Sequence, residues 1–93
     1  MAGAGPASVK AKIVNKRGLH ARASAKFVEL ACKYQSEITV TREGNSVSGR
    51  SIMGLMMLAA PQGSELEIAA SGDDAEAALA AIISLIAAGF HED

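Results

Sequence analysis

Alternation of apolar and polar residues in three short segments restricts the fold of this chain more than any other feature. Ser8–Val14, Glu37–Arg42 and Glu65–Ala69 each place apolar residues on one side and charged or hydroxyl-bearing residues on the other. This period of two predicts β-strands with one buried and one solvated face. A sheet made of such strands is covered by helices on one face only.

One more strand and three helices complete the predicted order. Turn residues at 43–45 predict a hairpin that continues into a strand over Ser46–Gly49. Helices are predicted over His20–Tyr34, over Ile52–Leu58 after a Ser51 cap, and from Asp74 to a stop at Gly89. The order β-α-β-β-α-β-α predicts an α/β two-layer open-faced sandwich. The buried stripe of the last helix is predicted to be Ala75, Ala78, Leu79, Ile82 and Ile86.

The chain has the length of one domain. Its 93 residues suffice for a modest core, which we expect to occupy residues 8–93. Residues 1–7 are predicted to form a flexible leader that has neither the charged start nor the apolar length of a secretory signal. The apolar stretch Ala77–Ala88 is too short and too rich in alanine to insert into a membrane. Cys32, the single cysteine, cannot form an internal disulfide, which fits a cytoplasmic protein.

The predicted first helix begins with a candidate phosphoryl acceptor, His20, followed two residues later by Arg22. Gly18 allows the chain to turn sharply into that helix. A helix start presents unpaired N–H groups and the positive end of the helix dipole, which bind phosphate and disfavour a protonated imidazole. A neutral imidazole beside an anion site can accept a phosphoryl group on nitrogen. The alternative is an ordinary polar histidine at an exposed turn.

Charge is distributed unevenly along the chain, although the net charge is only −1. Seven basic residues precede Tyr34 against Glu29 alone, and seven acidic residues with no Lys or Arg follow Ser64. Basic charge around His20 would attract an acidic protein or a phosphate-bearing partner. The acidic C-terminal half and the absence of interleaved basic and aromatic residues argue against nucleic-acid binding. No metal-ligand cluster and no nucleotide-binding loop are apparent, so no cofactor is expected.

The predicted short helix after Ser51 is apolar on all sides. Leu55 and Leu58 are predicted to face the sheet, and Met57 is predicted to fill a gap in the core. Met53 and Met56 are predicted to form an exposed protein-docking patch, with core packing as the alternative. The Ser51 cap also offers a phosphorylation site, where the added negative charge would obstruct an acidic partner.

Taken together, Asn15–Arg22 and Ser51–Leu55 resemble the HPr phosphocarrier family of the bacterial phosphotransferase system. The resemblance extends from Ser8 to the end of the chain and implies four antiparallel strands in the order 1-4-2-3. It implies that His20 takes a phosphoryl group on Nδ1 from phospho-enzyme I and passes it to a IIA component, with Arg22 holding the phosphate. It also implies docking through Ile52, Met53 and Met56, and phosphorylation of Ser51 by an HPr kinase/phosphorylase. Such a shuttle is a carrier rather than an enzyme, and we expect a monomer.

Two features depart from the usual family pattern. Ala23 stands where most members have proline, which predicts a slightly less rigid site with its chemistry intact. Asn15-Lys16 and the C-terminal residues resemble the nitrogen-related branch, NPr, whereas Ser51–Gly54 resembles kinase-regulated HPr. We therefore expect a regulatory output in carbon or nitrogen signalling, with sugar uptake as the alternative. Outside the family, a small-molecule-binding module and a structural adaptor remain alternatives.

Overall fold

The computed structural model describes residues 7–92, and the predicted leader lies mostly outside them. The elements follow one another in the predicted order, with one short 3-10 turn added at the end. Their bounds are β1 (Ala7–Lys12), α1 (Ala21–Ala31), β2 (Glu37–Arg42), β3 (Asn45–Ser48), α2 (Ile52–Met57), β4 (Glu65–Ser71), α3 (Ala75–Ala87) and the 3-10 turn η1 (Gly89–His91).

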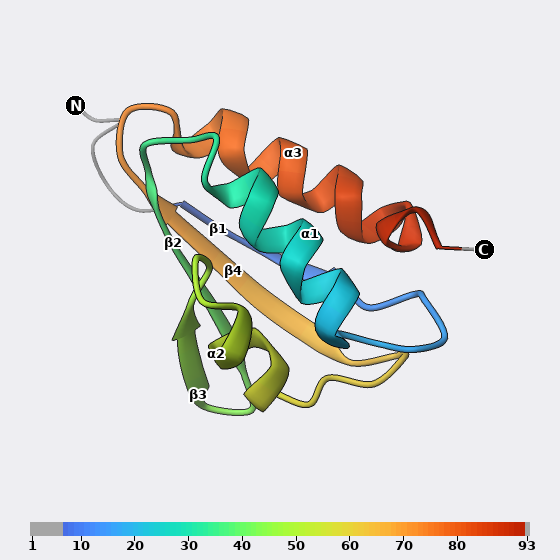
Figure 1. The fold of residues 1–93 in the computed structure, drawn as a ribbon. Helices are drawn as coiled ribbons and strands as arrows, with labels where there is room; N and C mark the ends of the chain where they lie inside the picture. The colour runs from blue at the N-terminus through green and yellow to red at the C-terminus, as the bar shows by residue number, and fades with distance from the viewer. Residues whose placement is uncertain (1–6, 93) are drawn as a thin grey trace.

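The sheet has the strand order β1-β4-β2-β3, and every neighbouring pair is antiparallel. Figure 1 shows α1 and α3 side by side across one face of the sheet, with α2 beside β3. The other face stays open, and Lys10 lies opposite Glu67 there in the strand register, as Lys12 lies opposite Glu65. The predicted open-faced sandwich with strand order 1-4-2-3 is thus confirmed.

The core lies between the sheet and the helices. Phe27 from α1, Leu55 from α2 and Ile68 from β4 are completely buried in it. Burial of each of these side chains contributes roughly 2 kcal/mol. The predicted stripe of α3 is confirmed, because its buried residues are Ala75, Ala78, Leu79, Ile82 and Ile86.

Several element ends differ from the prediction; β1 begins one residue earlier, at Ala7, and β4 extends two residues further, to Ser71. Strand β1 ends at Lys12 because Ile13 leaves the ladder and exchanges backbone hydrogen bonds with the loop residues Ser64 and Gly63, at 2.9 and 2.7 Å. Helix α1 ends at Ala31, three residues early, because Lys33 and Tyr34 form tighter bonds to the carbonyls three residues before them. The guanidinium of Arg50 then donates to the Tyr34 carbonyl at 2.8 Å.

The prediction that Met57 belongs to the core is wrong. Met57 has 79% of its surface exposed instead of filling a gap in the core. Helix α2 has only six residues, and its buried side consists of Leu55 together with Leu58, the residue that caps its C-terminus, as predicted. Met57 lies on the opposite side of this short helix and therefore contacts solvent.

Candidate functional site

The loop before α1 is shaped by Gly18. Gly18 has a φ of +66°, and a Cβ at this position would lie 2.3 Å from the carbonyl oxygen of Ala60. The same oxygen accepts the N–H of Leu19 at 2.9 Å, while the Asn15 amide donates to the Gly18 carbonyl at 2.8 Å. A glycine is therefore required here to bring the chain against the α2–β4 loop and to place His20 at the helix start.

His20 caps α1 instead of forming its first turn. Its backbone is extended (φ −77°, ψ −177°), and its carbonyl accepts the N–H of Ser24 at 2.8 Å. Nδ1 of the ring accepts the backbone N–H of Arg22 at 3.3 Å. Among the described residues, no acceptor is found for the N–H groups of Ala21 and Ala23. The ring thus points Nδ1 at a helix start with donors to spare, as an anion site requires.

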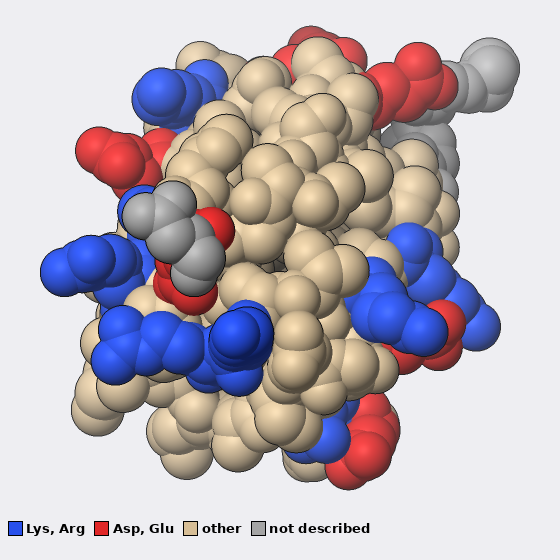
Figure 2. Space-filling model, turned by 90° about the vertical axis from the view of Figure 1, so that its right-hand side faces the viewer, with Lys and Arg blue, Asp and Glu red and all other residues tan. Residues whose placement is uncertain are grey.

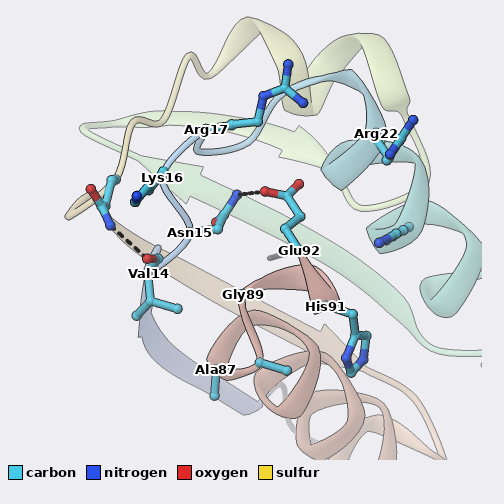
Figure 3. A pocket seen from close by; sticks show the side chains of 12 residues that line it. Val14, Asn15, Lys16, Arg17, Arg22, Ala87, Gly89, His91 and Glu92 are labelled. Carbon is cyan, nitrogen blue, oxygen red and sulfur yellow. Dashed lines mark hydrogen bonds between the residues drawn. The ribbon is translucent and has the colours of Figure 1, made fainter.

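The second ring nitrogen of His20, Nε2, contacts a carboxylate that the sequence did not predict. Glu92 lies 72 residues later and accepts from Nε2 through one oxygen, while its other oxygen accepts the Asn15 amide at 3.1 Å. Figure 3 shows the Glu92 side chain extending toward Asn15 from the end of the C-terminal turn. No local pattern links residues so far apart, so only the folded chain reveals this contact.

Glu92 is held in its charged form. Burial raises the pKa of its carboxyl group, but hydrogen bonds from His20 and Asn15 and the charges of His20 and Arg17 outweigh burial and lower the pKa. A carboxylate can only accept a hydrogen bond, so Nε2 carries the ring hydrogen when His20 is neutral. The lone pair of a neutral His20 is thereby assigned to Nδ1, which faces the helix start.

Positive charge surrounds this contact. A cavity of about 670 Å³ beside it is lined by several basic side chains and includes Glu92. Figure 2 shows Lys and Arg side chains gathered at this end of the molecule. His91 also lines the cavity, but its ring turns away from Glu92 (Figure 3). The basic residues of the cavity are Lys16, Arg17, Arg22 and Lys26.

Helix α2 adjoins the histidine on the other side. A hollow of about 300 Å³ is lined by both His20 and Met56, together with Arg17. Ile52 and Met53 are also exposed, by 41% and 72%. Ile52, Met53 and Met56 therefore form an apolar patch, and the hollow joins that patch to His20 through Met56.

Ser51 caps α2 as predicted. Its Oγ accepts the N–H of Gly54 at 2.9 Å, and its carbonyl accepts the N–H of Leu55 at 3.0 Å. The side chain is half-buried. The Arg22 side chain is exposed on α1, and its guanidinium makes no hydrogen bond to another described residue.

Two further findings concern residues 7–92. No group of three or more His, Cys, Asp or Glu side chains in this part of the chain is arranged to hold a metal ion. No helix of the described chain has the length and apolar character needed to cross a membrane.

Known proteins are similar to this chain in sequence and in fold. The family described as "PTS HPr component phosphorylation site" matches residues 7–88. The phosphocarrier protein HPr of Neisseria meningitidis serogroup A is 48% identical over 81 residues, which cover 87% of this chain and 91% of that protein. The phosphocarrier protein NPr of Shewanella violacea is 42% identical over 80 residues, covering 86% and 88% of the two chains.

The solved structure of HPr-C-His from Thermoanaerobacter tengcongensis superposes with a TM-score of 0.90 at 42% identity, over 94% of this chain and 98% of that one. Sequence and fold therefore agree along nearly the whole described chain. The chain belongs to the HPr family of the phosphotransferase system and is a phosphocarrier protein, a phosphoryl carrier rather than an enzyme.

Proposed function

We propose that His20 is the phosphoryl acceptor, that it is charged on Nδ1 by phospho-enzyme I, and that it passes the group to a IIA component. The observation that carries this proposal is the orientation of the ring. Nδ1 accepts the N–H of Arg22 at the start of α1, while Nε2 contacts Glu92. The nucleophilic nitrogen therefore lies where a phosphate would also find helix donors.

Transfer between two imidazoles depends on in-line approach and on neutralisation of charge. As Nδ1 bonds to phosphorus, the N–H of Arg22 is released to a phosphoryl oxygen. The N–H group of Ala21, which has no acceptor among the described residues, is a further donor. We assign the Arg22 guanidinium to a remaining phosphoryl oxygen, since it lines the cavity beside His20 without another described partner.

We propose that Ile52, Met53 and Met56 dock on enzyme I and on the IIA component. The patch is exposed and adjoins His20 through the hollow at Met56. Arg17 lines both that hollow and the basic cavity on the other side of His20, and this positive charge favours an acidic partner and speeds the encounter. We expect the carrier to act as a cytoplasmic monomer, because a shuttle must leave each partner readily.

We further propose a regulatory output through Ser51. A phosphate added by an HPr kinase/phosphorylase would stand at the start of α2, next to Ile52 and Met53 of the docking patch. Its charge of roughly −1.5 to −2 would repel an acidic partner from that patch. Incubation with ATP and the kinase should modify wild type and Ser48→Ala, but not Ser51→Ala.

The first experiment charges the protein with phosphoenolpyruvate and enzyme I. Wild type should gain the mass of one phosphoryl group, and acid should remove it. His20→Ala should gain none, whereas His91→Ala, which alters the other histidine of the chain, should be charged normally. No gain by wild type, with enzyme I active on another carrier, would refute the proposed function and favour a small-molecule-binding module.

A second experiment separates the two branches. Phosphorylated protein is offered in equal amounts to a sugar-specific IIA component and to a nitrogen-related one from the same organism. Faster transfer to the nitrogen-related component supports the regulatory branch. Faster transfer to the sugar-specific component assigns the protein to sugar uptake.

A further inference from the structure

We propose that Glu92 is a positioning residue for phosphoryl transfer: its carboxylate holds the His20 ring with Nδ1 free to attack and balances the charge that the ring acquires. This inference rests on the proposed function of His20. It adds a role for a C-terminal carboxylate that lies outside both sequence motifs. The observation behind it is the contact of Glu92 with His20 Nε2.

The C-terminal turn that carries Glu92 is firmly anchored. Phe90, which precedes it by two residues, is completely buried in the core. Its carbonyl accepts the ammonium group of Lys26 at 2.6 Å. Phe90 and His91 both adopt positive φ, at 57° and 60°, although neither is glycine. The surrounding contacts must stabilise so strained a turn, and they fix the direction in which Glu92 leaves it.

The carboxylate itself is held at both oxygens. One oxygen contacts His20 and the other accepts the Asn15 amide at 3.1 Å. Asn15 is 93% buried and also donates to the Gly18 carbonyl at 2.8 Å. The loop that positions His20 therefore also positions Glu92. The side chains of His20 and Glu92 are only 22% and 15% exposed, which distinguishes this contact from a solvated surface ion pair.

The chemistry of the step requires a counter-charge. Nδ1 forms a bond to phosphorus while the bond between phosphorus and the donor nitrogen breaks, and the donor nitrogen keeps that electron pair. The hydrogen on Nε2 stays in place, so the ring becomes a positively charged phosphoimidazolium. Glu92 accepts the Nε2 hydrogen before and after the step, and its attraction increases as the ring becomes positive. The carboxylate thus favours the transition state over the resting ring.

Two substitutions separate the parts of this role. Glu92→Ala removes both the hydrogen bond and the charge, whereas Glu92→Gln keeps an oxygen acceptor and removes the charge. Glu76→Gln is the matched control, because Glu76 is an exposed carboxylate on α3. For each variant, nitrogen-15 NMR measures the ring tautomer of His20, rapid-quench kinetics measures charging by phospho-enzyme I, and thermal unfolding measures Tm.

We expect Nε2–H to be the only neutral tautomer in wild type, and both tautomers to appear in Glu92→Ala. Charging should slow about tenfold in Glu92→Ala and in Glu92→Gln, and it should be unchanged in Glu76→Gln. Wild-type rates in both Glu92 variants would overturn the proposal, as would a loss of rate with an unchanged tautomer in Glu92→Ala and a lowered Tm. If wild type itself is not charged, the proposed function of His20 fails instead, so the two failures are distinguishable.

Discussion

Gly18 and Ala60 lie against each other beside the proposed phosphoryl acceptor, His20. A Cβ on Gly18 would approach the Ala60 carbonyl oxygen to 2.3 Å, and the N–H of Leu19 donates to that oxygen at 2.9 Å. One backbone carbonyl therefore both demands a glycine and holds the residue before His20. The geometry of the histidine depends on this contact.

Substitution of Gly18 should therefore harm both stability and activity. Gly18→Ala combines a left-handed backbone with a steric clash, and it should lower the free energy of unfolding by roughly 3 kcal/mol. Gly44→Ala is the control, since Gly44 has a φ of +84° with open space around it. It should cost only about 1 kcal/mol. Urea unfolding measures both values, and equal losses would show that the Ala60 contact is unimportant.

A carboxylate also joins the start of α3 to the loop before β2. Asp74 accepts the N–H groups of Gln35 and Ser36 at 2.9 and 3.0 Å, and it also accepts the Ser36 hydroxyl. The Ser36 hydroxyl, followed by the Gln35 N–H, lowers the pKa of Asp74 below its ordinary value of 3.8. This contribution to stability is fully present above pH 3.8, and it is lost as the pH falls through the lower folded-state pKa.

The test compares acid unfolding of three proteins. Asp74→Asn should be less stable than wild type at pH 7. Its stability should fall less between about pH 5 and about pH 2, because the titrating group is gone. Asp73→Asn, a change at the exposed neighbouring residue, should behave like wild type. Parallel acid profiles for wild type and Asp74→Asn would contradict the role assigned to Asp74.

The proposed docking patch predicts different effects for two neighbouring methionines. Met56 lines the hollow with His20, whereas Met57 is more exposed and lies outside that hollow. Met56→Gln should raise the KM of enzyme I for this carrier about tenfold, through a loss of about 1.4 kcal/mol of binding free energy, and should leave kcat unchanged. Met57→Gln should have little effect. Similar KM values for the two variants would place the partner elsewhere on the surface.

Local pattern predicted most of the fold. Strand β2 has the predicted bounds, Glu37–Arg42, because its alternation is regular and a turn follows it at once. The sheet-facing side of α2 was predictable from Leu55 and Leu58. The exposure of Met57 was not predictable, because this short helix carries apolar residues on all sides and periodicity cannot assign its faces.

The candidate site, like the fold, was predictable from the sequence only in part. The position of His20 at the start of α1 follows from Gly18 and from the helical pattern after it. The contact of Glu92 with His20 depends on a left-handed turn at Phe90 and His91, two residue types that give no local signal for such a turn. Asn15 and Lys26, which hold that turn or its glutamate, lie 77 and 64 residues from their partners. Such contacts follow only from tertiary packing.

Ala23 offers a test of how rigid the helix start needs to be. It occupies the third position of α1, and its N–H has no acceptor among the described residues, so proline removes no hydrogen bond there. Ala23→Pro, which restores the residue usual in this family, should raise the free energy of unfolding by about 0.5 kcal/mol by restricting the unfolded chain. Charging by enzyme I should stay within about twofold of wild type, because Nδ1 of His20 bonds to Arg22 and not to Ala23. Urea unfolding and rapid-quench kinetics measure the two quantities. A lower free energy of unfolding would mean that the fully buried site of Ala23 cannot hold the proline ring. Much slower charging would mean that the Ala23 N–H binds the phosphoryl group.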